Sequence, residues 1–180
     1  MKRFIRSLKF FLGHIFLKTL PLFSFPYLNN MIFRFMGYNL DKSVKIYSSA
    51  QILGNIIVKI GKDTFIGHET IIMGGNSTII IGKNCDISSR VNIISGTHKI
   101  DMHGQRSAGD GIGKDIVISD GVWIGFGASV LPGITIGEKS IIGAGSVVTK
   151  DIPAYTIAVG NPCKPIRRWS FDSQSYVNVT

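Results

Sequence analysis

An aliphatic residue stands at every sixth position from residue 118 to residue 148, and this period limits the possible fold more than any other feature of the chain. The positions are Ile118, Ile124, Val130, Ile136, Ile142 and Val148. The same spacing occurs earlier, interrupted by a slip of three residues at 74–76. The earlier positions are Ile60, Ile66, Ile72, Ile81, Ile87 and Ile93. Chance does not produce such a series, so the chain contains an internal repeat.

A period of six matches neither an amphipathic helix nor an alternating strand. It fits short strands separated by corners, with three sides closing a coil of about 18 residues and parallel strands stacked about 4.8 Å apart. One branched side chain per strand then points into a dry core. The repeat therefore predicts an all-β solenoid, a parallel β-helix, over residues 44–152.

Residues 96–114 do not follow the repeat. This stretch is rich in glycine and charge and contains two of the four histidines, His98 and His103. Insertions in a solenoid leave the stack as loops on one side. We expect a protruding loop here, and loops held on a rigid scaffold are common places for function.

Residues 1–43 form a separate basic and apolar segment. Residues 1–45 hold eight Lys or Arg and one acidic residue, Asp41, whereas the other 135 residues carry a net charge of only +2. We predict helices over about 3–20 and 28–36, ended near Pro21 and Gly37. The segment either caps the solenoid or, through residues 1–37, lies as an amphipathic anchor on an anionic membrane surface.

Other classes fit the composition less well. The apolar run in 10–25 is interrupted by polar residues before it reaches the roughly 20 residues that span a bilayer, and no small-x-small cleavage site follows it. The body has no basic stripe with aromatic platforms, so we expect no nucleic-acid partner. Cys85 and Cys163 fit no disulfide framework or zinc knuckle, which favours free thiols in a reducing compartment. We expect a cytoplasmic protein, and the alternative is a peripheral position at the inner face of the membrane.

Three further motifs accompany the hexads. They are Gly-Val-Trp-Ile-Gly at 121–125, Ile-Gly-Ala-Gly-Ser-Val-Val-Thr-Lys-Asp-Ile-Pro at 142–153 and Gly-Asn-Pro-Cys-Lys-Pro-Ile-Arg at 160–167. With these motifs, residues 44–169 resemble the bacterial hexapeptide-repeat acyltransferases, whose fold is a left-handed parallel β-helix. The resemblance is greatest to maltose, galactoside and polysaccharide O-acetyltransferases.

The resemblance implies an acetyl-CoA-dependent enzyme, a homotrimer with active sites between neighbouring prisms, and a sugar or cell-surface polysaccharide precursor as acceptor. It implies that His98 is the catalytic base. It also implies acetyl-CoA contacts from the body and from the C-terminal tail at 153–180, namely Ala144, Thr149, Lys150, Lys164 and Arg167. Phe126 departs from the galactoside-type pattern, which has a small polar residue there.

The residue types suit this chemistry. A neutral imidazole can take the proton of an attacking hydroxyl, and direct attack requires neither a cysteine nucleophile nor a metal. Lysine and arginine can bind the phosphates of coenzyme A. The plainer interpretations are a loop histidine without chemistry, a solvated basic tail and, for Ala144, a tight corner.

Other functions remain open from the sequence. An amino-sugar acceptor would make the protein an N-acetyltransferase. His98, His103 and His68 could instead supply the three ligands of a hexapeptide-repeat zinc carbonic anhydrase. A solenoid that has lost catalysis is the non-enzymatic alternative.

Overall fold

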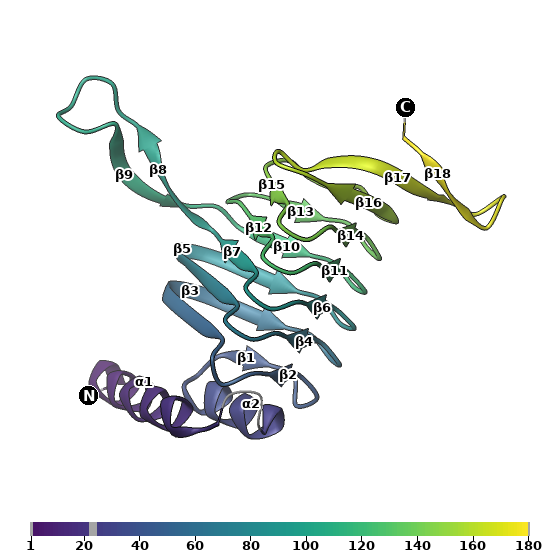
Figure 1. Cartoon of the computed structure of the whole chain (residues 1–180). Coiled ribbons are helices and arrows are strands. Elements are labelled where there is room, and N and C mark those ends of the chain that lie inside the picture. Colours follow the sequence, from purple (N-terminus) through teal and green to yellow (C-terminus); the bar gives the residue numbers. More distant parts are fainter. Residues whose placement is uncertain (1, 22–24, 180) are drawn as a thin grey trace.

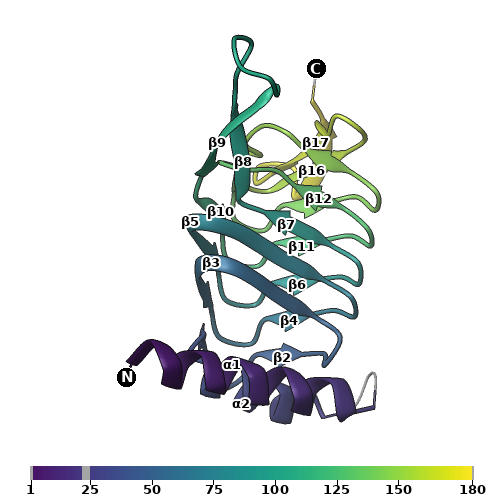
Figure 2. The same ribbon diagram turned by 90° about the vertical axis from the view of Figure 1, so that its left-hand side faces the viewer.

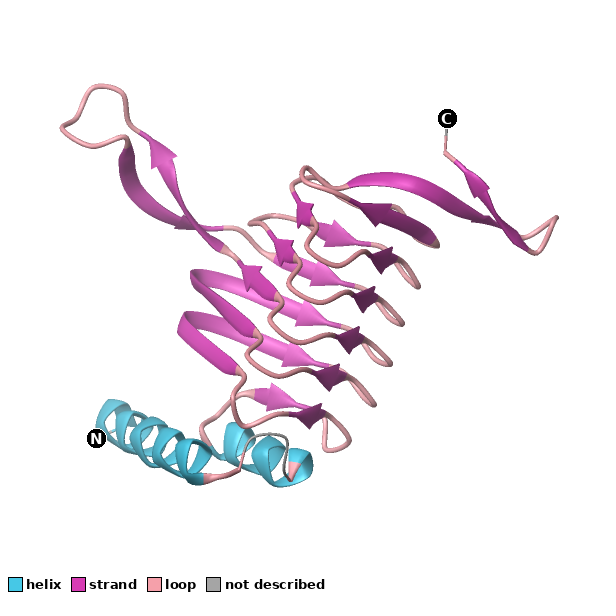
Figure 3. Cartoon of the chain, in the orientation of Figure 1, coloured by secondary structure: helices cyan, strands magenta, loops and turns pink. Residues whose placement is uncertain are grey.

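The protein is represented by a computed structural model that describes residues 2–21 and 25–179. Residues 1 and 22–24 of the N-terminal segment and residue 180 of the tail lie outside the described part. The body is a parallel β-helix with two helices at its N-terminal end, a projecting hairpin and an antiparallel tail (Figures 1 and 3). This is the solenoid predicted from the repeat.

Most strands are two or three residues long because each side of the prism is short. The strands of the coils are β1 (Asn39–Leu40), β2 (Lys45–Ile46), β3 (Gln51–Ile60), β4 (Phe65–Ile66), β5 (Ile71–Ile81), β6 (Asp86–Ile87), β7 (Asn92–Ile94), β10 (Ile116–Ile118), β11 (Trp123–Ile124), β12 (Ser129–Val130), β13 (Thr135–Ile136), β14 (Ile141–Ile142), β15 (Val147–Val148) and β16 (Thr156–Val159).

These strands form three faces. Face one contains β1, β10, β13 and the C-terminal halves of β3 and β5. Face two contains β2, β4, β6, β11, β14 and β16. Face three contains β7, β12, β15 and the N-terminal halves of β3 and β5. The strands within each face pair in parallel, one coil upon the next.

Each face contributes one column of buried, mostly aliphatic side chains, and from Ile60 to Val148 these are the residues of the six-residue series. Face one provides Leu40, Ile60, Ile81, Ile118, Ile136 and Ile152. Face two provides Ile46, Ile66, Ile87, Ile124, Ile142 and Ala158. Face three provides Ile52, Ile72, Ile93, Val130 and Val148. The period of six thus measures one side of the prism.

The corner between faces three and one, here called the hairpin corner, is irregular. β3 and β5 run continuously around it, and their register shifts at Asn55. Asn76 takes up the extra residue of β5 in a left-handed conformation, with φ of 50°. The three-residue slip in the repeat is therefore a bulged corner, and the irregular insertion leaves the next coil at this same corner.

The helices α1 (Lys2–Thr19) and α2 (Pro26–Phe35) close the N-terminal end of the prism, near the ranges predicted (Figures 1 and 2). The first coil of a β-helix leaves backbone groups unpaired. The buried amide of Asn30 donates to the carbonyl oxygens of Asp41 and Val44, both at 2.8 Å, and Asn29 donates to that of Ile46 at 3.0 Å. Side-chain amides of α2 thus replace the missing preceding coil.

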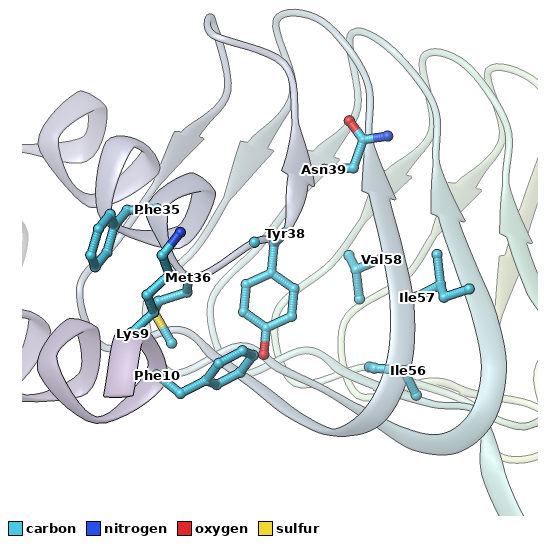
Figure 4. A pocket seen from close by; sticks show the side chains of 10 residues that line it. Lys9, Phe10, Phe35, Met36, Tyr38, Asn39, Ile56, Ile57 and Val58 are labelled. Atoms are coloured by element: carbon cyan, nitrogen blue, oxygen red, sulfur yellow. The ribbon is translucent and has the colours of Figure 1, made fainter. Parts of the chain in front are cut away.

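Helix α1 is attached through aromatic packing. Phe10 lies edge-on to Tyr38, with 5.5 Å between ring centroids (Figure 4). The Tyr38 hydroxyl donates to the Ile52 carbonyl oxygen at 2.9 Å. Among the described residues, no helix combines the length and the apolar character that crossing a bilayer requires.

The C-terminal tail turns back on the last coil. β17 (Lys164–Ser170) pairs antiparallel with β16, and β18 (Ser175–Asn178) pairs antiparallel with β17. The tail therefore covers the edge of face two that the last coil leaves open.

Two adjacent isoleucines of β5 test the core columns. Ile81 is 1% exposed between Ile60 and Ile118, whereas Ile80 is 38% exposed on the other side of the strand. We expect Ile81→Ala to lower the free energy of unfolding by about 2–5 kcal/mol because it leaves a cavity in the column. The matched control, Ile80→Ala, is expected to lower it by less than about 1 kcal/mol. Equal losses in urea unfolding would contradict the assignment of the inward face.

Candidate active site

The insertion at the hairpin corner is an ordered β-hairpin rather than the loop expected from sequence. β8 (Gly96–Ile100) and β9 (Ala108–Gly113) pair antiparallel and project away from the prism (Figures 1 and 2). Glycine and charged residues have low strand propensity, which is why the sequence did not indicate strands here.

The base of the hairpin packs closely on the bend of β5. A Cβ atom on Gly113 would collide with the carbonyl oxygen of Gly75, and one on Gly74 would collide with the hydroxyl of Ser95. The hydroxyls of Ser95 and Ser77 are 2.7 Å apart and hydrogen-bonded in the interior. Backbone contact at glycine therefore sets where the hairpin leaves the body.

His98 lies on β8, near the base of this hairpin, with its side chain exposed. Its Nδ1 is 2.8 Å from the carbonyl oxygen of Gly109 on the opposite strand. A carbonyl oxygen can only accept, so Nδ1 donates this hydrogen bond, and in the neutral imidazole the lone pair is then on Nε2. The hairpin thus orients the ring of His98 so that its neutral form could accept a proton at Nε2.

His98 lines a cleft of about 410 Å³ between the hairpin and the bend of β5. Its walls include Met73, Asn76, Thr97 and Ile112. An acceptor in this cleft would contact both the imidazole and the bulged corner.

The hairpin tip is ordered around Asp101. Its carboxylate accepts the backbone N–H groups of Gly104 and His103, both at 2.9 Å, and these bonds hold the pKa of Asp101 below its usual value. His103 is therefore part of the tip turn, through its backbone N–H.

The three histidines of the zinc alternative do not converge. His68 lies at the corner between faces two and three, where its Nδ1 is 2.6 Å from the Ser49 hydroxyl and its Nε2 is 3.3 Å from a carboxylate oxygen of Glu69. In the described part of the chain, no three His, Cys, Asp or Glu side chains gather into a metal site. The geometry gives the three-histidine interpretation no support.

A polar cleft beside the hairpin was not anticipated. It has a volume of about 450 Å³ and is lined by Asn55, Asn76, Ser77, Thr78 and Asp115, with Ile56 and Ile57. Asn76 also lines the His98 cleft. The slip at 74–76 was the only sign of this cleft in the sequence, because it marks an irregular turn of the chain. The stacking of the coils then shows that this turn lies beside the insertion.

Three of the predicted acetyl-CoA contacts share one cleft. Thr149, Lys150 and Lys164 line a cavity of about 210 Å³ where the last coil meets the tail. Cys163 also lines it, and burial raises the pKa of this thiol, so it is neutral near pH 7. Asp151 lines it as well, and its carboxylate accepts the Thr135 backbone N–H at 2.7 Å. The site therefore has two lysines that can contact an anion and no thiolate nucleophile.

The other two predicted contacts lie elsewhere on the prism. Ala144 is exposed in the turn between faces two and three, and Arg167 is exposed on β17, in register with Ile157 of face two. Face three separates them from the cleft of Lys150. A single chain therefore does not bring all five residues together.

Phe126 stands one coil below Ala144 at the same corner. Its ring is 52% exposed, and the Arg90 guanidinium lies 5.8 Å from its centroid. Arg90 also donates to Glu69 at 2.6 Å, which lowers the pKa of that carboxyl. The bulky ring at this position is thus held by a cation from the coil beneath.

Comparison with known proteins gives a consistent family assignment. The family model "Bacterial transferase hexapeptide (six repeats)" matches residues 115–150, and "Hexapeptide repeat of succinyl-transferase" matches residues 57–89. The solved structure of a maltose O-acetyltransferase from Clostridium difficile 630 is 34% identical, covers 91% of this chain and 85% of its own, and superposes with a TM-score of 0.73.

Two further relatives are similar to this chain over shorter stretches. The polySia specific acetyltransferase NeuO is 35% identical, with coverage of 69% of this chain and 61% of its own and a TM-score of 0.56. A provisionally named acetyltransferase of Schizosaccharomyces pombe is 47% identical over 111 residues, which is 62% of this chain and 53% of that protein. The chain spans little more than half the length of the curated relatives it matches.

Proposed function

Because this chain belongs to the hexapeptide-repeat acetyltransferase family, we propose that it transfers the acetyl group of acetyl-CoA to a hydroxyl of a saccharide, with His98 as general base. The observation that carries the proposal is the hydrogen bond from His98 Nδ1 to the Gly109 carbonyl oxygen, which leaves Nε2 free to accept a proton. The acceptor is a sugar or a cell-surface polysaccharide precursor.

The reaction is a direct transfer. Nε2 of His98 accepts the hydroxyl proton while the acceptor oxygen attacks the thioester carbonyl carbon. The tetrahedral intermediate then expels the thiolate of coenzyme A, which takes the proton back from the imidazolium. No covalent enzyme intermediate is needed, in agreement with the buried, neutral thiol of Cys163.

The cations near the end of the β-helix suit the phosphates of coenzyme A. Lys150 and Lys164 lie two coils beyond the His98 insertion along the same corner. At about 4.8 Å per coil this separation is about 10 Å along the axis, a distance that the flexible pantetheine arm can span. Acetyl-CoA bound along this corner would have its phosphates at the tail and its thioester near the hairpin.

The acceptor side includes polar side chains, which suit a saccharide. Asn76 lines both clefts, and Thr78 and Asp115 line the cleft beside the hairpin. The maltose and polysialic acid named for two relatives belong to the same hydroxyl-rich class. A hydroxyl also requires deprotonation during attack, which gives the free Nε2 its role.

The active site is proposed to lie between the chains of a homotrimer. Ala144 and Arg167 are separated by face three from Thr149, Lys150 and Lys164. A groove between two prisms lets one chain provide the hairpin corner while its neighbour provides the corner of Ala144. Both sets could then contact one acetyl-CoA molecule.

Substitution of His98 tests the base. We expect His98→Ala to lower kcat by about 10²- to 10⁴-fold, measured as thiol release from acetyl-CoA across a panel of sugars and nucleotide sugars. His103→Ala, in the same hairpin, is the matched control and should retain activity. Wild-type turnover by His98→Ala would remove the imidazole from the mechanism.

Neighbouring arginines of β17 test the phosphate contact. Arg167 pairs in register with Ile157 and Arg168 with Thr156, so their side chains point to opposite sides of the sheet. We expect Arg167→Ala to raise the KM for acetyl-CoA about tenfold with a smaller change in kcat, because a charge-assisted contact in the bound complex is lost. Arg168→Ala should leave KM unchanged, and a larger effect on kcat than on KM would place Arg167 in the chemistry instead.

Subunit mixing tests the shared site. Light scattering should give three times the 19.7 kDa chain mass. His98→Ala and Ala144→Arg chains, each inactive alone, should regain about a quarter of the wild-type rate when assembled together, since random assortment leaves that share of interfaces intact. Mixing His98→Ala chains with the double variant is the control without recovery. Mixed trimers that stay inactive would show that His98 and Ala144 of each active site come from the same chain.

A further inference from the structure

Each of the two N-terminal helices exposes a group of large apolar side chains. The floor patch comprises side chains that are each at least 37% exposed, namely Leu8, Phe11, Leu12, Ile15 and Phe16 of α1 and Tyr27, Leu28, Met31 and Phe35 of α2. We propose that this patch docks onto the surface of an anionic lipid bilayer, with both helices lying in the plane of the headgroups.

Other side chains hold the helices to each other and to the prism. α1 is held through Phe10, Gly13 and Leu17, one helical turn apart, and Met36 fills the space beside Gly13. α2 is held through Asn29, Asn30 and Phe33. The floor patch lies on the opposite side of each helix, where the fold itself gives no reason for so many large apolar residues.

Cations border the patch. On α1, Lys9 and Lys18 are exposed at the two margins of the apolar face, and on α2 Arg34 lies beside Met31 and Phe35. The Lys9 ammonium lies 5.3 Å from the centroid of the Phe35 ring (Figure 4). An apolar face rimmed by Lys and Arg is complementary to lipid headgroups of negative charge above an acyl layer.

The same charges argue against a second copy of the chain as the occupant. Two floor patches placed face to face would bring the rims of Lys9, Lys18 and Arg34 together, and like charges repel across such a contact. Anionic lipid neutralises the rim and accepts the aromatic side chains at the same time. The charge distribution of the whole chain agrees, since the excess of positive charge lies in the N-terminal quarter.

The position of the helices leaves the candidate active site accessible. α1 and α2 lie side by side below the first coil, whereas the hairpin leaves the middle of the prism and points away from the helices, and the tail lies at the other end (Figures 1 and 2). In the proposed homotrimer, a threefold axis parallel to the β-helix would place three floor patches on one plane, so that weak single contacts add up. That last step rests on the proposed function, and the docking itself does not.

Vesicle binding tests the proposal, with no acetyl-CoA present. The full chain is sedimented with vesicles of phosphatidylcholine alone or of equal parts phosphatidylcholine and phosphatidylglycerol, at low and high salt. We expect binding to the anionic vesicles that weakens as salt screens the charges, and little binding to phosphatidylcholine alone. Equal binding to both vesicle types, or none to either, would overturn the proposal.

Matched variants locate the contact. Phe11→Asp and Met31→Asp should each lower partitioning more than tenfold, and Lys9→Gln and Lys18→Gln about fivefold each. Met102→Asp, at an exposed position of the hairpin, is the control and should bind as wild type. Circular dichroism of every variant checks that a loss of binding is not a loss of folding. Acetyl transfer is measured in a separate assay, so that failure of the docking and failure of the proposed function can be told apart.

Two results would exclude the patch as the lipid contact. Phe11→Asp and Met31→Asp that still bind anionic vesicles like wild type would place the contact elsewhere. The protein could instead fail to bind either kind of vesicle while the Phe11→Asp substitution lowers its mass in solution. That result would identify a second copy of the chain as the occupant of the patch.

Discussion

The stacking of branched aliphatic side chains in three buried columns is the interaction on which the rest of this structure depends. Each coil places one such residue per face directly above its counterpart, as Ile66, Ile87 and Ile124 show on face two. Burial of each side chain stabilises the fold by roughly 1.5–3 kcal/mol, and the parallel ladder keeps successive coils in register. Corners therefore also stack, and residues far apart in sequence come to lie along one edge.

The candidate active site lies where the stack is interrupted. The columns need only six residues per side, so extra residues must leave at a corner. The slip at 74–76 and the insertion at 96–114 leave at the same corner in consecutive coils, and glycine at positions 74 and 113 lets the two backbones approach closely. The result is a histidine oriented by a carbonyl oxygen next to a polar cleft, on a stack of hydrogen-bonded coils.

The two ends of the prism are finished in different ways, and each end has a distinct chemistry. At the C-terminal end an antiparallel tail covers face two and brings Lys164 beside Lys150. At the N-terminal end the amides of Asn29 and Asn30 satisfy the first coil, and the opposite side of the same helices remains apolar and cationic. The capping role and the membrane-surface role considered from sequence are thus compatible, since they use opposite faces of the helices.

The sequence by itself determined the β-helix, because the hexads report directly which side chains are buried and how long each side is. It also identified an irregular, histidine-bearing insertion and the basic apolar character of the N-terminal segment. Tertiary structure alone decided that the insertion is a hairpin, that Gly109 orients His98, and that Asn76 faces the same cleft. It also showed that Ala144 and Lys150 lie at different corners and that His68 is remote from His98. These are relations between coils, and a six-residue period specifies the interior of each coil while leaving the residues at its corners unconstrained.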